Sequence, residues 1–208
     1  MKKVILSLGL LVGMAGVANA QTGLKLGLKG GFNGSTVSGT DSKGSEYKAG
    51  FAAGGLINYG FTDNISVQGE LLYSQKGFSI DNVGGSNLTA KSTLGYIDVP
   101  ILFKYTIGDD GKGLFLELGP QGSFILHQRS FVEDSGGKQV GSSETSTDAF
   151  NKAVIGYVGG IGYQLTSGLG LGVRYTGDVS QVFKDDAGAL NVHNSVFQFQ
   201  VHYLFGGE

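Results

Sequence analysis

Four charged residues are the strongest candidates for internal chemistry, because each interrupts a run of apolar or small neighbours. These residues are Glu70, Lys104, Glu117 and Arg174. Each lies in a segment where apolar and polar residues alternate, and successive side chains of a β-strand point to opposite faces. All four would therefore share one polar face. We expect an ion-pair network with Lys104 between two carboxylates of neighbouring strands, and with the Arg174 guanidinium reaching across.

Three further charged residues, Lys25, Lys29 and Asp98, fall on the same predicted face, and we expect them to join the network. An unpaired charge in a narrow, partly dry lumen is costly, which favours pairing. Two interpretations remain open. The network is either a plug that opens to pass small ions, or a filling that fixes the interior. The filling is the simpler interpretation, since the interior of a closed barrel of about eight strands is only wide enough for side chains.

Catalytic chemistry has weak support. Two groups come nearest to a nucleophile–base set: His127 with Ser130, and His193 with Asp185 and Asp186. Neither spacing fixes a nucleophile beside a base, and polar loops produce such pairs by chance. His202 falls on the inward face and is predicted to be a hydrogen-bonded filler. We predict no catalytic residue, no cofactor and no metal ligand.

The segments that carry these residues alternate with a period of two. Eight of them can be recognised, at residues 23–33, 47–61, 65–79, 94–107, 114–131, 152–165, 169–176 and 195–205. Eight apolar faces are too many for one small soluble core, whereas a closed sheet can turn them all toward lipid. The sequence predicts an all-β fold, an eight-stranded antiparallel up-and-down transmembrane β-barrel. A soluble lipocalin-like barrel is the alternative, but it would need an apolar interior and a polar exterior.

The connections between these segments alternate in length. Short turns lie at residues 62–64, 108–113 and 166–168, and long polar stretches at 34–46, 80–93, 133–149 and 184–194. Outer-membrane barrels have short periplasmic turns and long external loops. The long loops therefore offer a surface to an unidentified extracellular partner.

The N-terminal residues 1–20 resemble a secretory signal peptide. Met1-Lys2-Lys3 is positively charged, an apolar run follows, and Ala18-Asn19-Ala20 is a typical cleavage site. Residues 21–208 then form the barrel domain. The chain has no cysteine, which excludes disulfides and a lipoprotein anchor, and its net charge of −2 argues against nucleic-acid binding.

The segment Gly95-Tyr96-Ile97-Asp98-Val99-Pro100-Ile101-Leu102-Phe103-Lys104-Tyr105 resembles a signature of small outer-membrane β-barrel proteins of the Bacteroidetes type. These proteins are often labelled "porin family" and are similar in architecture to OmpA and OmpX. The resemblance implies a Gram-negative outer membrane, lipid around the barrel, and a C-terminal insertion signal at Tyr203 and Phe205 for the insertion machinery. Such chains usually end on that aromatic residue, whereas residues 206–208 follow here.

These observations predict an integral outer-membrane protein, not an enzyme, with a structural or surface-interaction role. A low-conductance channel for small solutes or ions is the alternative. A rim-located enzyme and a soluble binding barrel are further alternatives.

Overall fold

The computed structural model describes residues 23–40, 42, 45–81, 86, 88–108, 111–134, 136–184 and 191–205. Its strands are β1 (Leu24–Ser38), β2 (Ser45–Gly60), β3 (Ile65–Ile80), β4 (Leu88–Ile107), β5 (Gly113–Asp134), β6 (Gln139–Glu144), β7 (Ala153–Gln164), β8 (Leu169–Asp178) and β9 (His193–Leu204). The described residues include no helix of the length and hydropathy needed to cross a membrane. The predicted signal peptide lies outside the described residues.

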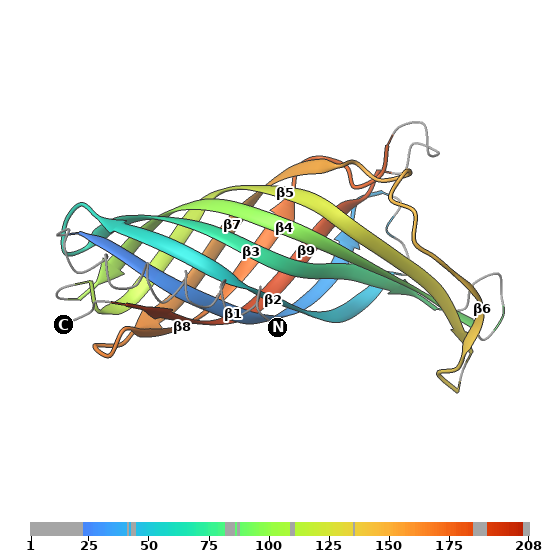
Figure 1. Ribbon diagram of the computed structural model, residues 1–208, viewed down its shortest axis with the longest axis horizontal. Helices are drawn as coiled ribbons and strands as arrows, with labels where there is room; N and C mark the ends of the chain where they lie inside the picture. The colour runs from blue at the N-terminus through green and yellow to red at the C-terminus, as the bar shows by residue number, and fades with distance from the viewer. Residues whose placement is uncertain are drawn as a thin grey trace, which may run out of the picture.

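The strands close into a ring (Figure 1). Neighbours pair in the order β4-β3-β2-β1-β9-β8-β7-β5, and a β4–β5 pairing joins the two ends. The pairings around the ring are antiparallel, from Leu24↔Tyr59 between β1 and β2 to Leu169↔Tyr203 between β8 and β9. The eight predicted segments correspond to the eight strands of this ring. The prediction of an eight-stranded antiparallel barrel is confirmed.

The structure has one strand outside the ring, β6, which was not predicted. It pairs with the far end of β5 through Val132↔Val140 and Glu133↔Gln139, within the stretch 133–149 that was expected to be a loop. The neighbouring strands are also longer than expected, since β4 pairs with β5 from Leu88↔Asp134 onward. Antiparallel backbone pairing does not require apolar side chains, so polar stretches extend the sheet beyond the ring. This extension and β6 project from the long-loop end in Figure 1.

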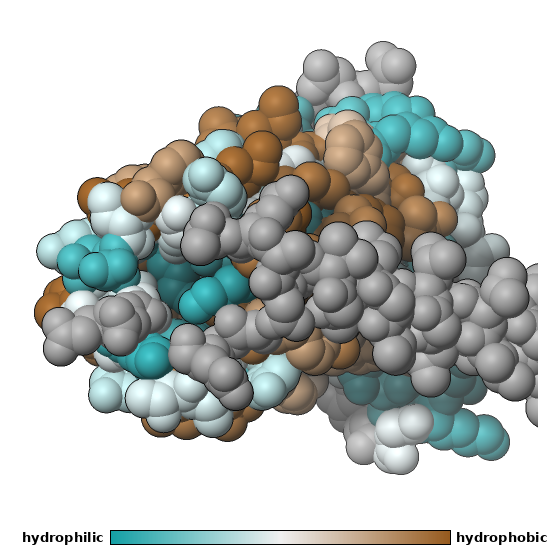
Figure 2. All heavy atoms as spheres, turned by 60° about the vertical axis from the view of Figure 1, so that its left-hand side comes forward, coloured by the Kyte–Doolittle hydropathy of each residue, from teal (hydrophilic) through white to brown (hydrophobic). Residues whose placement is uncertain are grey.

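The side chains are sorted as a membrane barrel requires. Apolar residues of every ring strand point outward, for example Phe32 at 60%, Leu71 at 60%, Leu118 at 64% and Ile155 at 65% exposure. The buried interior is mostly polar or charged. Figure 2 turns the short-turn end toward the viewer and shows hydrophobic residues on the outer wall and hydrophilic ones in the hollow. This arrangement excludes the soluble lipocalin-like barrel, which needs the opposite sorting.

Candidate functional site: the charged lumen

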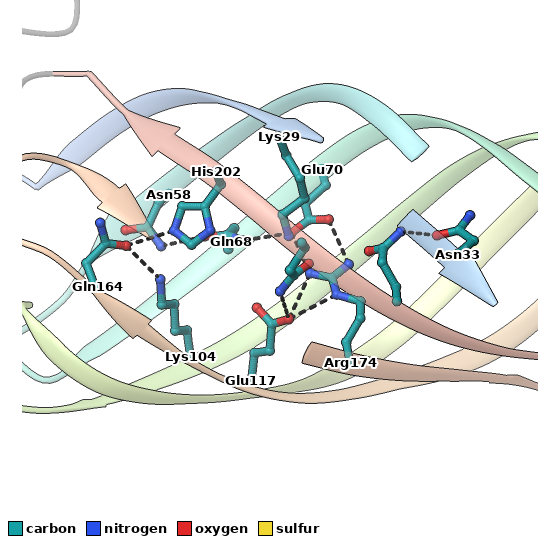
Figure 3. A network of polar contacts seen from close by, with 12 residues as sticks. Lys29, Asn33, Asn58, Gln68, Glu70, Lys104, Glu117, Gln164, Arg174 and His202 are labelled. Atoms are coloured by element: carbon teal, nitrogen blue, oxygen red, sulfur yellow. Dashed lines mark hydrogen bonds and ion pairs between the residues drawn. The ribbon is translucent and has the colours of Figure 1, made fainter. Parts of the chain in front are cut away.

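Arg174 holds two carboxylates in the middle of the lumen. Its Nη1 and Nη2 atoms donate to Glu70 Oε2 and Oε1, each at 3.0 Å, which makes a bidentate pair. Its Nε and Nη2 atoms lie 3.0 Å and 2.8 Å from Glu117 Oε1. All three side chains are almost fully buried, with exposures of 2%, 0% and 1% for Arg174, Glu70 and Glu117. We call these three residues the Arg174 clamp (Figure 3).

A glycine on β7 makes room for the clamp. Gly160 pairs with Glu117 of β5 on one side and with Arg174 of β8 on the other. A Cβ atom at Gly160 would lie 2.8 Å from Glu117 Oε1 and 3.0 Å from Arg174 Cβ. The absence of a side chain at this position therefore lets the two charged groups meet across β7.

Neighbouring groups complete the clamp. Lys29 Nζ lies 2.5 Å from Glu70 Oε1, as an ion pair, and Gln68 Nε2 donates to the same oxygen at 2.7 Å. Gln200 Nε2 donates to Glu117 Oε1 at 2.8 Å. With Lys29 included, two cations face two carboxylates, so the cluster is neutral as a whole. This balance offsets the cost of taking the four charges out of water.

Lys104 lies apart from the clamp, which differs from the expected pairing. Its backbone is opposite Glu117 in the β4–β5 register, but its Nζ atom lies 3.4 Å from Gln164 Oε1 and 3.9 Å from the Phe115 ring centroid. Figure 3 shows the side chain directed toward Gln164, away from Arg174. The planar guanidinium can bind a carboxylate in bidentate fashion, which an ammonium group cannot do, and Arg174 contacts both oxygens of Glu70 and Oε1 of Glu117.

A second charged cluster lies nearer the long-loop end. Lys76 Nζ is 3.0 Å from both Asp98 Oδ1 and Ser123 Oγ, and it stands 4.8 Å above the Tyr96 ring centroid. Asp98 was expected to join the network around Glu70 and instead pairs here. Lys76 was missed, although it has the same strand parity as Glu70, and that parity was the available signal.

An apolar cluster lies at the long-loop end of the lumen. Leu94 and Tyr96 of β4 and Val154 of β7 pack with Phe150 and Val182 from the connecting segments. A backbone bridge joins Phe150 to Phe183, and their ring centroids are 4.9 Å apart. We call the group formed by these residues the apolar cap. The sequence analysis did not predict it, because Phe150 and Val182 lie outside the predicted strands. The signal was the presence of these phenylalanines in otherwise polar connections.

The histidines are not in the arrangements considered for catalysis. The His127 ring contacts Tyr73, with Nε2 at 3.0 Å from the phenol oxygen, whereas Ser130 Oγ donates to Ser92 Oγ. His193 Nδ1 lies 3.1 Å from the Ser180 carbonyl oxygen, and residues 185 and 186 lie outside the described part of the chain. His202 Nε2 lies 2.8 Å from Gln164 Oε1 within the lumen. Among the described residues, no three His, Cys, Asp or Glu side chains form a potential metal site.

The predicted insertion signal lies at the short-turn end. Tyr203 is 44% exposed, and its ring packs edge-on against Phe205 with centroids 5.3 Å apart. The Phe205 N–H donates to the Leu26 carbonyl oxygen at 2.8 Å, which ties this end to β1. Residues 206–208 lie outside the described residues. The role of this pair in membrane insertion stays a prediction.

Residues 19–184 match the model of the outer membrane protein beta-barrel domain. The chain belongs to this family. The matched region ends before β9, yet β9 pairs with both β1 and β8 and is needed to close the ring. Family membership assigns the protein to the bacterial outer membrane, with lipid around its apolar wall. The resemblance to Bacteroidetes barrels and the cleaved signal peptide stay predictions.

Solved structures of similar fold are outer-membrane barrels. One is Ail, the attachment invasion locus protein of Yersinia pestis, in a complex with the heparin analogue sucrose octasulfate. It is 15% identical to this chain with a TM-score of 0.51, and the match covers 88% of this chain and 100% of Ail. A second Ail structure gives 15% identity and a TM-score of 0.51, with 89% and 100% covered. Neisserial surface protein A is 16% identical with a TM-score of 0.46, covering 86% and 96%. No match was found among curated proteins. Identities this low show the fold alone.

Proposed function

We propose that this protein is a closed outer-membrane barrel with a structural or surface-interaction role, and that it does not pass solutes. The observation that carries the proposal is the Arg174 clamp, which spans the lumen from β8 to Glu70 on β3 and Glu117 on β5. A guanidinium that bridges two opposing walls obstructs the lumen and fixes their separation.

The clamp is costly to open. Displacing Arg174 would leave two buried carboxylates with too few cations, and breaking a buried pair typically costs about 3–5 kcal/mol. The apolar cap lies beyond the clamp, toward the long-loop end, and adds a second barrier without charge. An ion would have to pass both barriers in series.

The surface part of the proposal rests on the extended sheet at the long-loop end. There β4 and β5 continue to the pair Leu88↔Asp134, and β6 adds a further strand. Exposed strands and their connections offer backbone and side-chain groups to a partner. An Ail structure contains a sulfated ligand, but at 15% identity that ligand is not carried over to this chain.

A low-conductance channel is the second candidate. It is favoured by the continuous row of hydrogen-bonded polar side chains that runs along the lumen from Asn58 through Gln68 to Glu70 (Figure 3). Such a row can carry water if its members move apart.

Planar-bilayer recording separates the two candidates. The mature chain is refolded in detergent, and only the fraction whose gel mobility shifts on boiling is reconstituted. We expect no steady unitary openings from the wild type. Steady openings whose size changes in Glu117→Gln, but not in the exposed loop variant Lys138→Gln, would overturn the closed-barrel proposal in favour of the channel.

A further inference from the structure

The short-turn end of the barrel contains a cavity of about 640 Å³. Its lining includes Lys25 of β1, Asn58 of β2, Ser66 of β3, and Lys104 and Thr106 of β4. Figure 2 shows the hydrophilic hollow at this end of the molecule. The volume falls within the range of about 300–1,000 Å³ that is usual for small-molecule sites.

Hydrogen-bonded side chains connect the lining of the cavity to the Arg174 clamp. Asn58 Nδ2 in the lining donates to Gln68 Oε1 at 3.3 Å, and Gln68 donates to Glu70 of the Arg174 clamp at 2.7 Å. The clamp therefore lies one side chain beyond the cavity wall. A solute in the cavity would enter and leave by the short-turn end, the end that outer-membrane barrels place in the periplasm.

Among the described lining residues, positive charges outnumber negative ones. Lys25, Lys104 and Lys112 line the cavity, and Asp63 is the acidic residue among the described lining residues. Lys112 has other interactions, whereas Lys25 and Lys104 lie on strands of the ring. These two come from β1 and β4, which are separated in the ring by β2 and β3, so they line the cavity from different walls.

Among the described residues, no carboxylate is seen at ion-pair distance from Lys104 Nζ, although Glu117 is opposite Lys104 in the β4–β5 register and attracts its charge. Lys104 is 3% exposed, and its Nζ atom contacts the Gln164 amide oxygen and the Phe115 ring. Both are weaker partners for an ammonium ion than a carboxylate or phosphate. By contrast, Lys29 and Lys76, on the same inward face, each have a carboxylate within 3.0 Å.

We propose that this cavity binds a phosphate-class oxyanion, either inorganic phosphate or a phosphate monoester, between Lys25 and Lys104. The two carboxylates of the clamp are already paired with Arg174 and Lys29, so the anion would give Lys104 a counter-charge at contact distance, in a site where burial strengthens the attraction. The hydroxyl groups of Ser66 and Thr106 line the same cavity and can donate to oxygens of the anion. The site would give the barrel a solute-binding function on its short-turn side, which the proposed surface role does not include.

Isothermal titration calorimetry on the refolded, detergent-solubilised protein tests the proposal, with sodium phosphate and glycerol phosphate as probes at constant ionic strength. We expect saturable binding by the wild type. Lys104→Gln and Lys25→Gln should each weaken it about tenfold or more, as the loss of one charge-assisted contact implies. Lys138→Gln makes the same charge change on the exposed β5–β6 turn and should bind as the wild type does.

The two probes distinguish the source of the phosphate group. Tighter binding of glycerol phosphate would assign the site to a monoester, and tighter binding of inorganic phosphate would assign it to the free ion. Absence of saturable binding to both probes would overturn the proposal, as would equal weakening in all three variants. Lys25→Gln keeps the test valid if Lys104→Gln does not refold, since Lys25 is half-exposed at the cavity wall. Conductance is measured separately, so failure here leaves the closed-barrel proposal untouched.

Discussion

The middle of the lumen and its long-loop mouth are closed by opposite kinds of chemistry. The Arg174 clamp joins three buried charged side chains, all from strands of the ring. The apolar cap joins buried hydrophobic side chains, and Phe150 and Val182 come from connecting segments. The clamp fixes the walls of the barrel relative to one another, whereas the cap depends on how the connections fold inward. We therefore expect the clamp to control global stability and the cap to control local opening.

The largest effect is expected from Arg174→Gln. The variant leaves Glu70 and Glu117 buried with Lys29 as their remaining close cation, so the free energy of unfolding should fall by about 3–5 kcal/mol. Urea unfolding of the protein in lipid vesicles, followed by gel mobility without boiling, measures this change. A loss below about 1 kcal/mol would show that the clamp does not hold the barrel together.

Gly160→Val should give the next largest effect. The added side chain would displace Glu117 Oε1 and Arg174, because a Cβ atom at this position lies 2.8 Å and 3.0 Å from their atoms. Overpacking of this kind costs about 1–3 kcal/mol. Gly159→Val is the matched control, since a Cβ atom there has its nearest contact with Leu118 Cδ1 at 3.8 Å. Equal losses in the two variants would contradict the role given to Gly160.

Phe150→Ala should increase local opening of the apolar cap more than it lowers the global free energy of unfolding. Phe150 is 6% exposed and contacts the Phe183 ring, so truncation opens the apolar cap, with a global loss of about 2 kcal/mol or less. Limited proteolysis should cut residues 145–152 faster than in the wild type. Phe124→Ala removes a ring that is 49% exposed on the outer wall and serves as the control. An unchanged cleavage rate in Phe150→Ala would contradict the cap.

The smallest effect is expected from Lys104→Gln. No carboxylate among the described residues loses its ion-pair partner, so stability should change by less than about 1 kcal/mol in the same urea assay. A loss as large as that of Arg174→Gln would mean that Lys104 belongs to the clamp after all.

The alternation of residues was sufficient to predict the ring and the inward-facing charges, because side-chain direction in a strand follows from sequence parity alone. Parity placed Glu70, Glu117 and Arg174 on the inner face. It could not decide which of them meet, since that depends on strand stagger around the closed ring and on the reach of each side chain. Lys104 illustrates the limit, because it is opposite Glu117 in register but lies beside Gln164.

The apolar cap and β6 were beyond this reasoning for a different reason. β6 and the cap residues Phe150 and Val182 lie in polar connecting stretches, where the conformation depends on tertiary contacts and not on periodicity. Phe150 and Phe183 are far apart in the sequence and meet because their connections fold over the same mouth. Isolated aromatic residues in a polar loop are the sequence feature that indicates such contacts.

The measurement that tests the central claim most directly is single-channel recording of four proteins: the wild type, Arg174→Gln, Phe150→Ala and the double variant. If the clamp and the cap close the lumen in series, the wild type and both single variants remain without steady openings, and the double variant conducts. Steady conductance by the wild type, or a double variant that folds and stays closed, would contradict the account.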